Sequence, residues 1–111
     1  MFNIDQSAAR YLDKRSGAVT VQLKFESALG GCACSDKQIT GSYVPSVLVG
    51  NPPNNEKANY QVQQVGSVKV YYPANLKVKE GYREIRIYLK SFLLLDWLEI
   101  EGAQGVSVTI S

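Results

Sequence analysis

The sequence predicts a β-rich α+β domain of about seven short strands and one N-terminal helix. Several segments alternate apolar and polar residues, which is typical of strands with one buried face. Helical spacing occurs with confidence only near the N-terminus. Glycine, proline and asparagine pairs separate these segments and mark turns. Because the helix precedes the strands instead of alternating with them, an α+β arrangement is favoured over a parallel α/β sheet.

The composition predicts a single domain over residues 1–111. This length is near the commonest domain size, and the apolar share of 45% is sufficient for one core. The net charge is only +2 and the basic residues are scattered, so no nucleic-acid partner is expected. The longest apolar run, 92–95, is far shorter than the roughly 18–20 residues that span a bilayer. With no signal peptide visible, we expect a cytoplasmic protein without a membrane partner.

The helix is expected within residues 3–17. Asp5 or Ser7 is a suitable N-cap, because its side-chain oxygen can accept a backbone N–H at the helix start. The pair Ser16-Gly17 is expected to end the helix. The residues whose spacing turns them toward the core are Ala8, Tyr11 and Leu12.

The clearest strand is predicted over residues 18–27. One face consists of Val19, Val21, Leu23 and Phe25, and is expected to be buried. The other face consists of Thr20, Gln22, Lys24 and Glu26, and is expected to contact water.

The remaining chain predicts further short strands. They are a strand at 44–50, an exposed turn at 51–59, a hairpin at 60–73 that turns at Gly66-Ser67, an irregular turn at 73–82, a strand at 83–90, a buried turn followed by a strand around 97–101, and a strand at 105–111. The residues expected to be largely buried are Val21, Leu23, Val68, Val70, Ile85, Ile87 and Trp97.

Cys32 and Cys34 are the only cysteines, and they follow Gly30-Gly31 directly after the strand at 18–27. A cysteine nucleophile usually needs a histidine base, and the chain contains no histidine, so an enzyme of that kind is not expected. The spacing is Cys-x-Cys and differs from the Cys-x-x-Cys of thioredoxin-type sites. A disulfide across so small a ring is strained and easily reduced.

The two thiols suggest a metal site shared between chains. Closed zinc sites and iron–sulfur clusters typically use four ligands, whereas one chain offers two thiolates and, nearby, only the harder ligand Asp36. Two copies of the chain could supply four thiolates across a homodimer interface. Two alternatives stay open: a thiol redox protein that reversibly oxidises Cys32 and Cys34, and an interaction module whose cysteines have no role.

The order of these features resembles the HesB/IscA-like family of A-type iron–sulfur carriers. A strand leads into "GGC" on a loop, and "VGSVKVYYPANL" follows in a later hairpin. The chain is most similar to a small branch described by a Cys-Cys or Cys-selenocysteine motif. The resemblance implies a HesB-like fold, an iron–sulfur cluster or iron with Cys32 as the ligand that matches the family, and cluster assembly or delivery to iron–sulfur acceptor proteins. Cys34, where the family usually has glycine, is a candidate ligand from its spacing alone. The Cys-Gly-Cys of typical carriers has no counterpart in "EGAQGVSVTIS".

Overall fold

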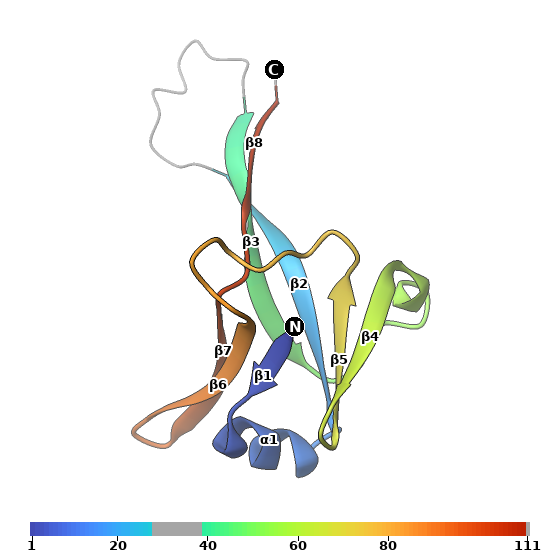
Figure 1. The fold of residues 1–111 in the computed structure, drawn as a ribbon, viewed down its shortest axis with the longest axis vertical. Coiled ribbons are helices and arrows are strands. Elements are labelled where there is room, and N and C mark those ends of the chain that lie inside the picture. Colours follow the sequence, from blue (N-terminus) through green and yellow to red (C-terminus); the bar gives the residue numbers. More distant parts are fainter. Residues whose placement is uncertain (28–38, 111) are drawn as a thin grey trace.

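The computed structural model describes residues 1–27 and 39–110, which contain eight strands and one α-helix in two mixed sheets (Figure 1). The predicted β-rich α+β fold with one N-terminal helix is therefore confirmed. The elements are β1 (Phe2–Ile4), α1 (Gln6–Asp13), β2 (Ala18–Ser27), β3 (Ile39–Val49), the short 3-10 helix η1 (Lys57–Asn59), β4 (Tyr60–Val65), β5 (Val68–Pro73), β6 (Ile85–Phe92), β7 (Leu95–Glu101) and β8 (Val106–Ile110).

The larger sheet has the strand order β4-β5-β2-β3-β8, and the smaller has the order β1-β6-β7. Most neighbours in these sheets are antiparallel hairpin or meander partners. The exceptions are the parallel pairs β2–β5 and β1–β6. The short strand β1 was included in the helical segment at the sequence level, and its pairing with β6 brings the start of the chain against the smaller sheet.

One apolar core joins both sheets and α1. Its buried members come from β1, α1, β2, β5 and β6, together with Leu76 from the turn after β5. They are Phe2, Leu12, Val19, Val21, Val68, Val70, Leu76, Ile85 and Ile87. Burial of such aliphatic side chains contributes roughly 1.5–3 kcal/mol each. The prediction of a buried position is thus confirmed for Val21, Val68, Val70, Ile85 and Ile87.

Two residues of the predicted core are not fully buried. Leu23 is only half-buried, and Trp97 is 38% exposed. Leu23 packs against the edge of the core without being fully covered. Trp97 lies on the face of β7 opposite to Leu98 and Ile100, which are the residues of this strand that pack against the core.

Helix α1 places Ala8 and Leu12 in the core, as predicted, while Tyr11 is half-buried. Asp5 occupies the N-cap position, but its side chain makes no capping hydrogen bond. Ser7 lies inside the helix, so it is not the cap either. At the other end, Gly17 has a φ of 66° and donates its N–H to the Leu12 carbonyl over 2.8 Å. Glycine adopts this left-handed conformation without the Cβ clash of other residues, and the chain turns here into β2.

Strand β2 follows the predicted alternation, with two corrections. Phe25, expected to be buried, is 37% exposed because it lies beyond the core. Thr20, expected to contact water, is 2% exposed and donates its hydroxyl to the Gly50 carbonyl over 2.8 Å. Its strand is flanked here by β5 on one side and β3 on the other. Because a buried hydroxyl needs a partner, the Gly50 carbonyl makes this burial tolerable.

The later strands agree with the prediction in their order but not in their lengths. Strand β3 begins at Ile39, five residues before the predicted strand at 44–50. The β4–β5 hairpin turns at Gly66-Ser67 as predicted, with Val65 paired to Val68. The segment expected to form a buried turn near residue 93 is instead the exposed end of the β6–β7 hairpin.

Candidate functional site

The two cysteines belong to the connection between β2 and β3. Residues 28–38, and with them Cys32 and Cys34, lie outside the described residues, so their predicted role as ligands stays a prediction. The described strands on either side show where this connection begins and ends. Strand β2 pairs with β5 only through Ala18–Thr20. Beyond that point its partner is β3, which in turn pairs with β8.

We call this extension the arm; it comprises residues 22–27 of β2, 39–45 of β3, and β8. In Figure 1 the arm projects away from α1 and from the β6–β7 hairpin. Lys24, Phe25 and Glu26 are all exposed, although they alternate in the strand. The ends of β2 and β3, from which the chain continues into residues 28–38, therefore lie away from the core.

An aromatic contact fixes the register of the arm. Phe25 is paired with Tyr43, and their ring centroids are 5.3 Å apart in an edge-to-face arrangement. A Cβ at Gly41 would lie 2.5 Å from the Glu26 carbonyl oxygen and 2.7 Å from the Phe25 ring. Because glycine alone leaves room for that ring, the pairing of Ser27 with Gly41 is well defined. The two strand ends that hold the cysteine connection are consequently neighbours.

A hollow of about 520 Å³ lies beside the arm. Lys24 and Tyr43 from the arm line it together with Tyr60 of β4, and the other lining residues are Gln22, Leu23, Pro73 and Asn75. These side chains offer aromatic, amide and ammonium groups. Such groups are poor ligands for transition metals, which prefer thiolate, imidazole and carboxylate. The hollow adds no ligand to the predicted cysteine site.

Within residues 1–27 and 39–110, no three histidine, cysteine or acidic side chains gather in a group that could hold a metal ion. Cys32, Cys34 and Asp36 lie outside these ranges. Any metal site of the predicted kind draws its ligands from the connection between β2 and β3.

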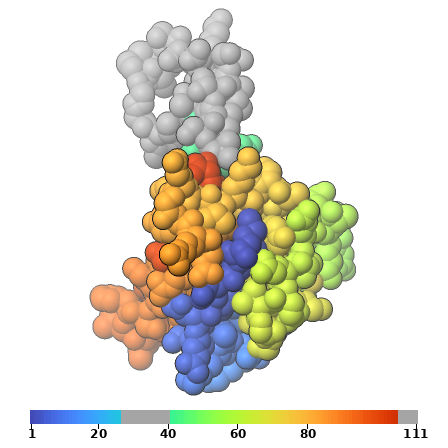
Figure 2. Space-filling model, viewed as in Figure 1, coloured from blue at the N-terminus to red at the C-terminus, as the bar shows by residue number. Residues whose placement is uncertain are grey.

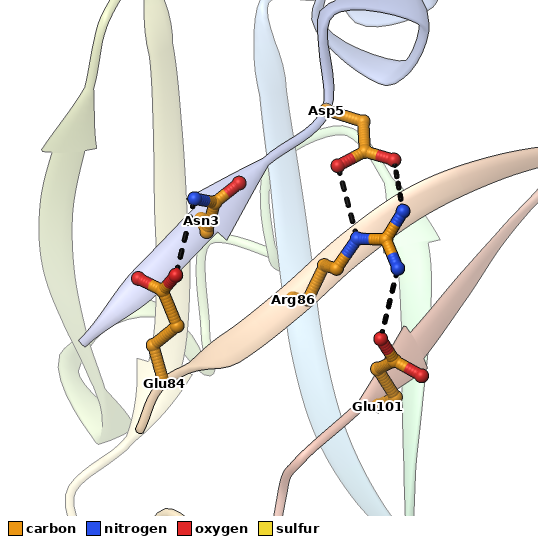
Figure 3. A network of polar contacts seen from close by, with 5 residues as sticks. All are labelled: Asn3, Asp5, Glu84, Arg86 and Glu101. Carbon is orange, nitrogen blue, oxygen red and sulfur yellow. Dashed lines mark hydrogen bonds and ion pairs between the residues drawn. The ribbon is translucent and has the colours of Figure 1, made fainter. Parts of the chain in front are cut away.

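A charged network connects α1 to the smaller sheet (Figure 3). Arg86 of β6 donates from Nη2 and Nε to the two carboxylate oxygens of Asp5, over 2.6 and 3.0 Å. Its Nη1 donates to Glu101 of β7 over 3.0 Å. Nearby, Asn3 of β1 donates to Glu84 over 3.1 Å. The network thus links β1, the start of α1, β6 and β7.

The role of this network is structural. The hydrogen bonds from Arg86 lower the pKa of Asp5, outweighing the slight loss of hydration that acts in the opposite direction. The two carboxylates in turn raise the pKa of Arg86. A carboxylate held ionised in this way is a poor proton donor or acceptor near neutral pH. The pairing explains why Asp5 does not cap α1: its oxygens are occupied by Arg86.

The sequence analysis missed a second surface, at the end of the β6–β7 hairpin. Phe92, Leu93, Leu94 and Leu95 are 66%, 86%, 99% and 68% exposed. The sequence does contain a signal for this surface. Four consecutive apolar residues stand between two alternating segments, at a place where a hairpin turn is normally polar. Figure 2 shows this orange hairpin projecting from the body of the molecule at the lower left.

Comparison with known proteins identifies the family. A model described as the CC/Se motif containing family matches residues 1–103. The chain belongs to this family. The match spans Cys32 and Cys34 and ends before β8. No curated protein and no solved structure is significantly similar to the chain.

Proposed function

We propose that this CC/Se-family protein binds a metal ion or an iron–sulfur cluster through Cys32 and Cys34. The proposal is supported by the position of both cysteines, one residue apart, between paired strands of a chain whose family is named for a CC/Se motif. Thiolates are preferred ligands for zinc, copper(I) and iron–sulfur clusters. In the wider proposal the chain is a relative of the HesB/IscA-like carriers and acts in cluster assembly or delivery.

The donor set favours a site shared by two chains. Each chain contributes two thiolates and no imidazole. Four thiolates from a homodimer would complete a tetrahedral zinc site or the four ligands of a cluster. A bound cluster would then be cargo for acceptor proteins, and the arm would present it away from the core of each protomer. No catalytic step by the protein's own residues is part of this proposal.

The direct test is reconstitution with iron and sulfide under reducing, oxygen-free conditions. We expect visible charge-transfer absorbance, about one cluster per two chains from the four-ligand rule, and a loaded form that sediments as a dimer. Zinc alone should bind in the same ratio if the site selects zinc. Cys32→Ser and Cys34→Ser should each abolish binding, whereas the control Ser35→Ala should retain it because it removes no thiol. Equal metal content in the parent and the double serine variant would disprove the proposal.

The spacing of the cysteines favours one second candidate, a thiol redox protein. Oxidation of the two thiols to a disulfide releases two electrons and two protons to an external oxidant, and the strained Cys-x-Cys ring makes the reverse reduction easy. A parent protein that binds no metal but cycles between dithiol and disulfide in a glutathione buffer would favour this function. Trapping of the free thiols by alkylation, followed by mass measurement, distinguishes the two forms.

A further inference from the structure

The end of the β6–β7 hairpin is an apolar tip, which we define as Phe92, Leu93, Leu94 and Leu95. The tip is the most exposed group of large apolar side chains in the described part of the chain, with Leu94 at 99%. Trp97, 38% exposed, lies beside it on β7 and pairs with Lys90. Contiguous exposed apolar groups of this kind mark surfaces that bind a protein or a membrane.

The backbone at Leu93 has a conformation that is unfavourable for leucine. Phe92 pairs with Leu95, so Leu93 and Leu94 form a two-residue turn. Leu93 has a φ of 57°, in the left-handed region. This position of a two-residue hairpin turn normally belongs to glycine, because a Cβ is unfavourable there. Neither burial nor turn geometry explains leucine at this point, so strain and exposure together indicate a binding role.

Cationic side chains lie next to the tip. Helix α1 packs against β6, and between helix and hairpin is a hollow of about 410 Å³ lined by Arg10, Lys14 and Arg15 from the helix and by Leu89 and Asp96 from the hairpin. Lys90 adds a further exposed cation on the outer face of β6. In Figure 1 the hairpin end and α1 lie at the same end of the molecule.

Three acids lie at this end, and each accepts a hydrogen bond that leaves its negative charge in place. Asp13 accepts from Ser67 over 2.8 Å, Asp96 from Ser91 over 2.5 Å, and Glu99 from the Trp97 indole over 3.0 Å. The four cations Arg10, Lys14, Arg15 and Lys90 outnumber these three carboxylates. The surface around the apolar tip is therefore complementary to an anionic partner.

We propose that this end of the molecule docks on an anionic lipid membrane, with the apolar tip inserted among the acyl chains and the α1 cations on the headgroups. Apolar insertion combined with attraction of Lys and Arg to acidic lipids is the general basis of reversible surface binding. Trp97 then lies at the interface, the environment that its amphipathic ring favours.

The shape of the tip favours lipid over protein. A stable protein interface uses about 20–30 residues on each side, whereas the tip presents four side chains on a narrow convex turn. A bilayer accepts such a turn without a complementary groove. We expected no membrane partner because the sequence contains no apolar run long enough to span a bilayer. In the described residues no helix is long and apolar enough to span a membrane, and surface docking does not need one.

Trp97 is the one tryptophan in the sequence, so its fluorescence reports membrane binding directly. With phosphatidylcholine vesicles that contain phosphatidylserine, we expect the Trp97 emission to shift to shorter wavelength and the protein to sediment together with the vesicles. Vesicles of phosphatidylcholine alone should bind more weakly, and salt should weaken binding to the anionic vesicles. Lipids with brominated acyl chains should quench Trp97.

The tip variants decide whether the apolar residues insert. Leu93→Ser/Leu94→Ser should weaken partitioning to anionic vesicles roughly tenfold or more, since two leucines lose their apolar transfer. Leu94→Ser has a matched control in Val62→Ser, which removes another exposed apolar side chain, on β4, and should bind like the parent. Arg10→Gln/Lys14→Gln should reduce binding and its salt dependence. Circular dichroism checks that each variant folds.

Three results would overturn the proposal: no vesicle binding by the folded parent, equal binding by the folded Leu93→Ser/Leu94→Ser variant, or self-association through the tip without vesicle binding. The last result would assign the tip to a second copy of the chain. Cys32→Ser/Cys34→Ser should bind vesicles like the parent, so failure of the metal proposal and failure of this one are distinguishable.

Discussion

Two hairpins of this protein share one turn geometry and differ in what they place at the turn. The β4–β5 hairpin turns through Gly66-Ser67, and the β6–β7 hairpin turns through Leu93-Leu94. The first turn residue has a φ of 60° in one and 57° in the other. Glycine and serine are the residues that such a turn favours. Since the same backbone can be formed by ordinary turn residues, the leucines of the second hairpin are best explained by what they contact outside the chain.

The second contrast lies within the β6–β7 hairpin. Near its base, Ile85 and Ile87 are fully buried between the sheets, and Arg86 joins the hairpin to Asp5. Toward its end, the same two strands carry exposed apolar residues. The base is therefore expected to determine stability and the tip to determine binding.

The largest effect should separate the base from the tip. Ile87→Ala should lower the free energy of unfolding by about 2–5 kcal/mol, because it leaves a cavity in the core. Leu94→Ala should change it by less than about 0.5 kcal/mol, since the side chain is already in water. Urea unfolding followed by circular dichroism measures both. Similar losses for the two variants would mean that the tip packs against the protein.

An exchange of turn residues tests the comparison of the two hairpins. Gly66→Leu should destabilise the protein by about 1–2 kcal/mol, because leucine is unfavourable at positive φ. An added Cβ at this position meets no atom within 4 Å, so the loss would come from the backbone and not from a clash.

The reverse exchange should have the opposite sign. Leu93→Gly should stabilise the protein by roughly 0.5–1 kcal/mol, the relief of strain being partly offset by the flexibility of glycine in the unfolded chain. Leu94→Gly is the control, because residue 94 is not among the positive-φ residues and should gain nothing. A loss of stability in Leu93→Gly would show that the left-handed leucine is not strained.

The smallest effect concerns the ion pair at the hairpin base. Arg86 lowers the pKa of Asp5 in the folded protein below its ordinary value of 3.8. The stabilising contribution of Asp5 is therefore present above that value and is lost as the pH falls through the folded pKa. Asp5→Asn should be slightly less stable than the parent at pH 7, and the difference should shrink in acid.

Thermal unfolding between pH 7 and pH 2 measures this difference. Glu56→Gln, which removes an acid before η1 and outside the Arg86 network, is the control. If the difference in thermal stability between the parent and Asp5→Asn did not change with pH, the ion pair would not lower the pKa of Asp5 in the folded state relative to the unfolded state.

The sequence by itself determined the fold class, the single helix, the β4–β5 hairpin and most of the core. Residues such as Val21, Val70 and Ile87 alternate with polar neighbours, and the hydrophobic effect turns one face of each strand inward. It also identified Cys32 and Cys34 as the candidate ligands, since their residue types and spacing suffice to indicate thiolate chemistry.

Only the tertiary structure decided where each alternating strand leaves the core. Thr20 is buried where β3 and β5 flank its strand. Trp97 is exposed on the face of β7 opposite to Leu98 and Ile100, and the apolar tip is exposed at the end of the β6–β7 hairpin. Likewise, Asp5 binds Arg86, 81 residues away, instead of capping its own helix. Local periodicity specifies which residues share a face, but burial and pairing depend on which distant segments cover that face, and this is a property of the folded chain.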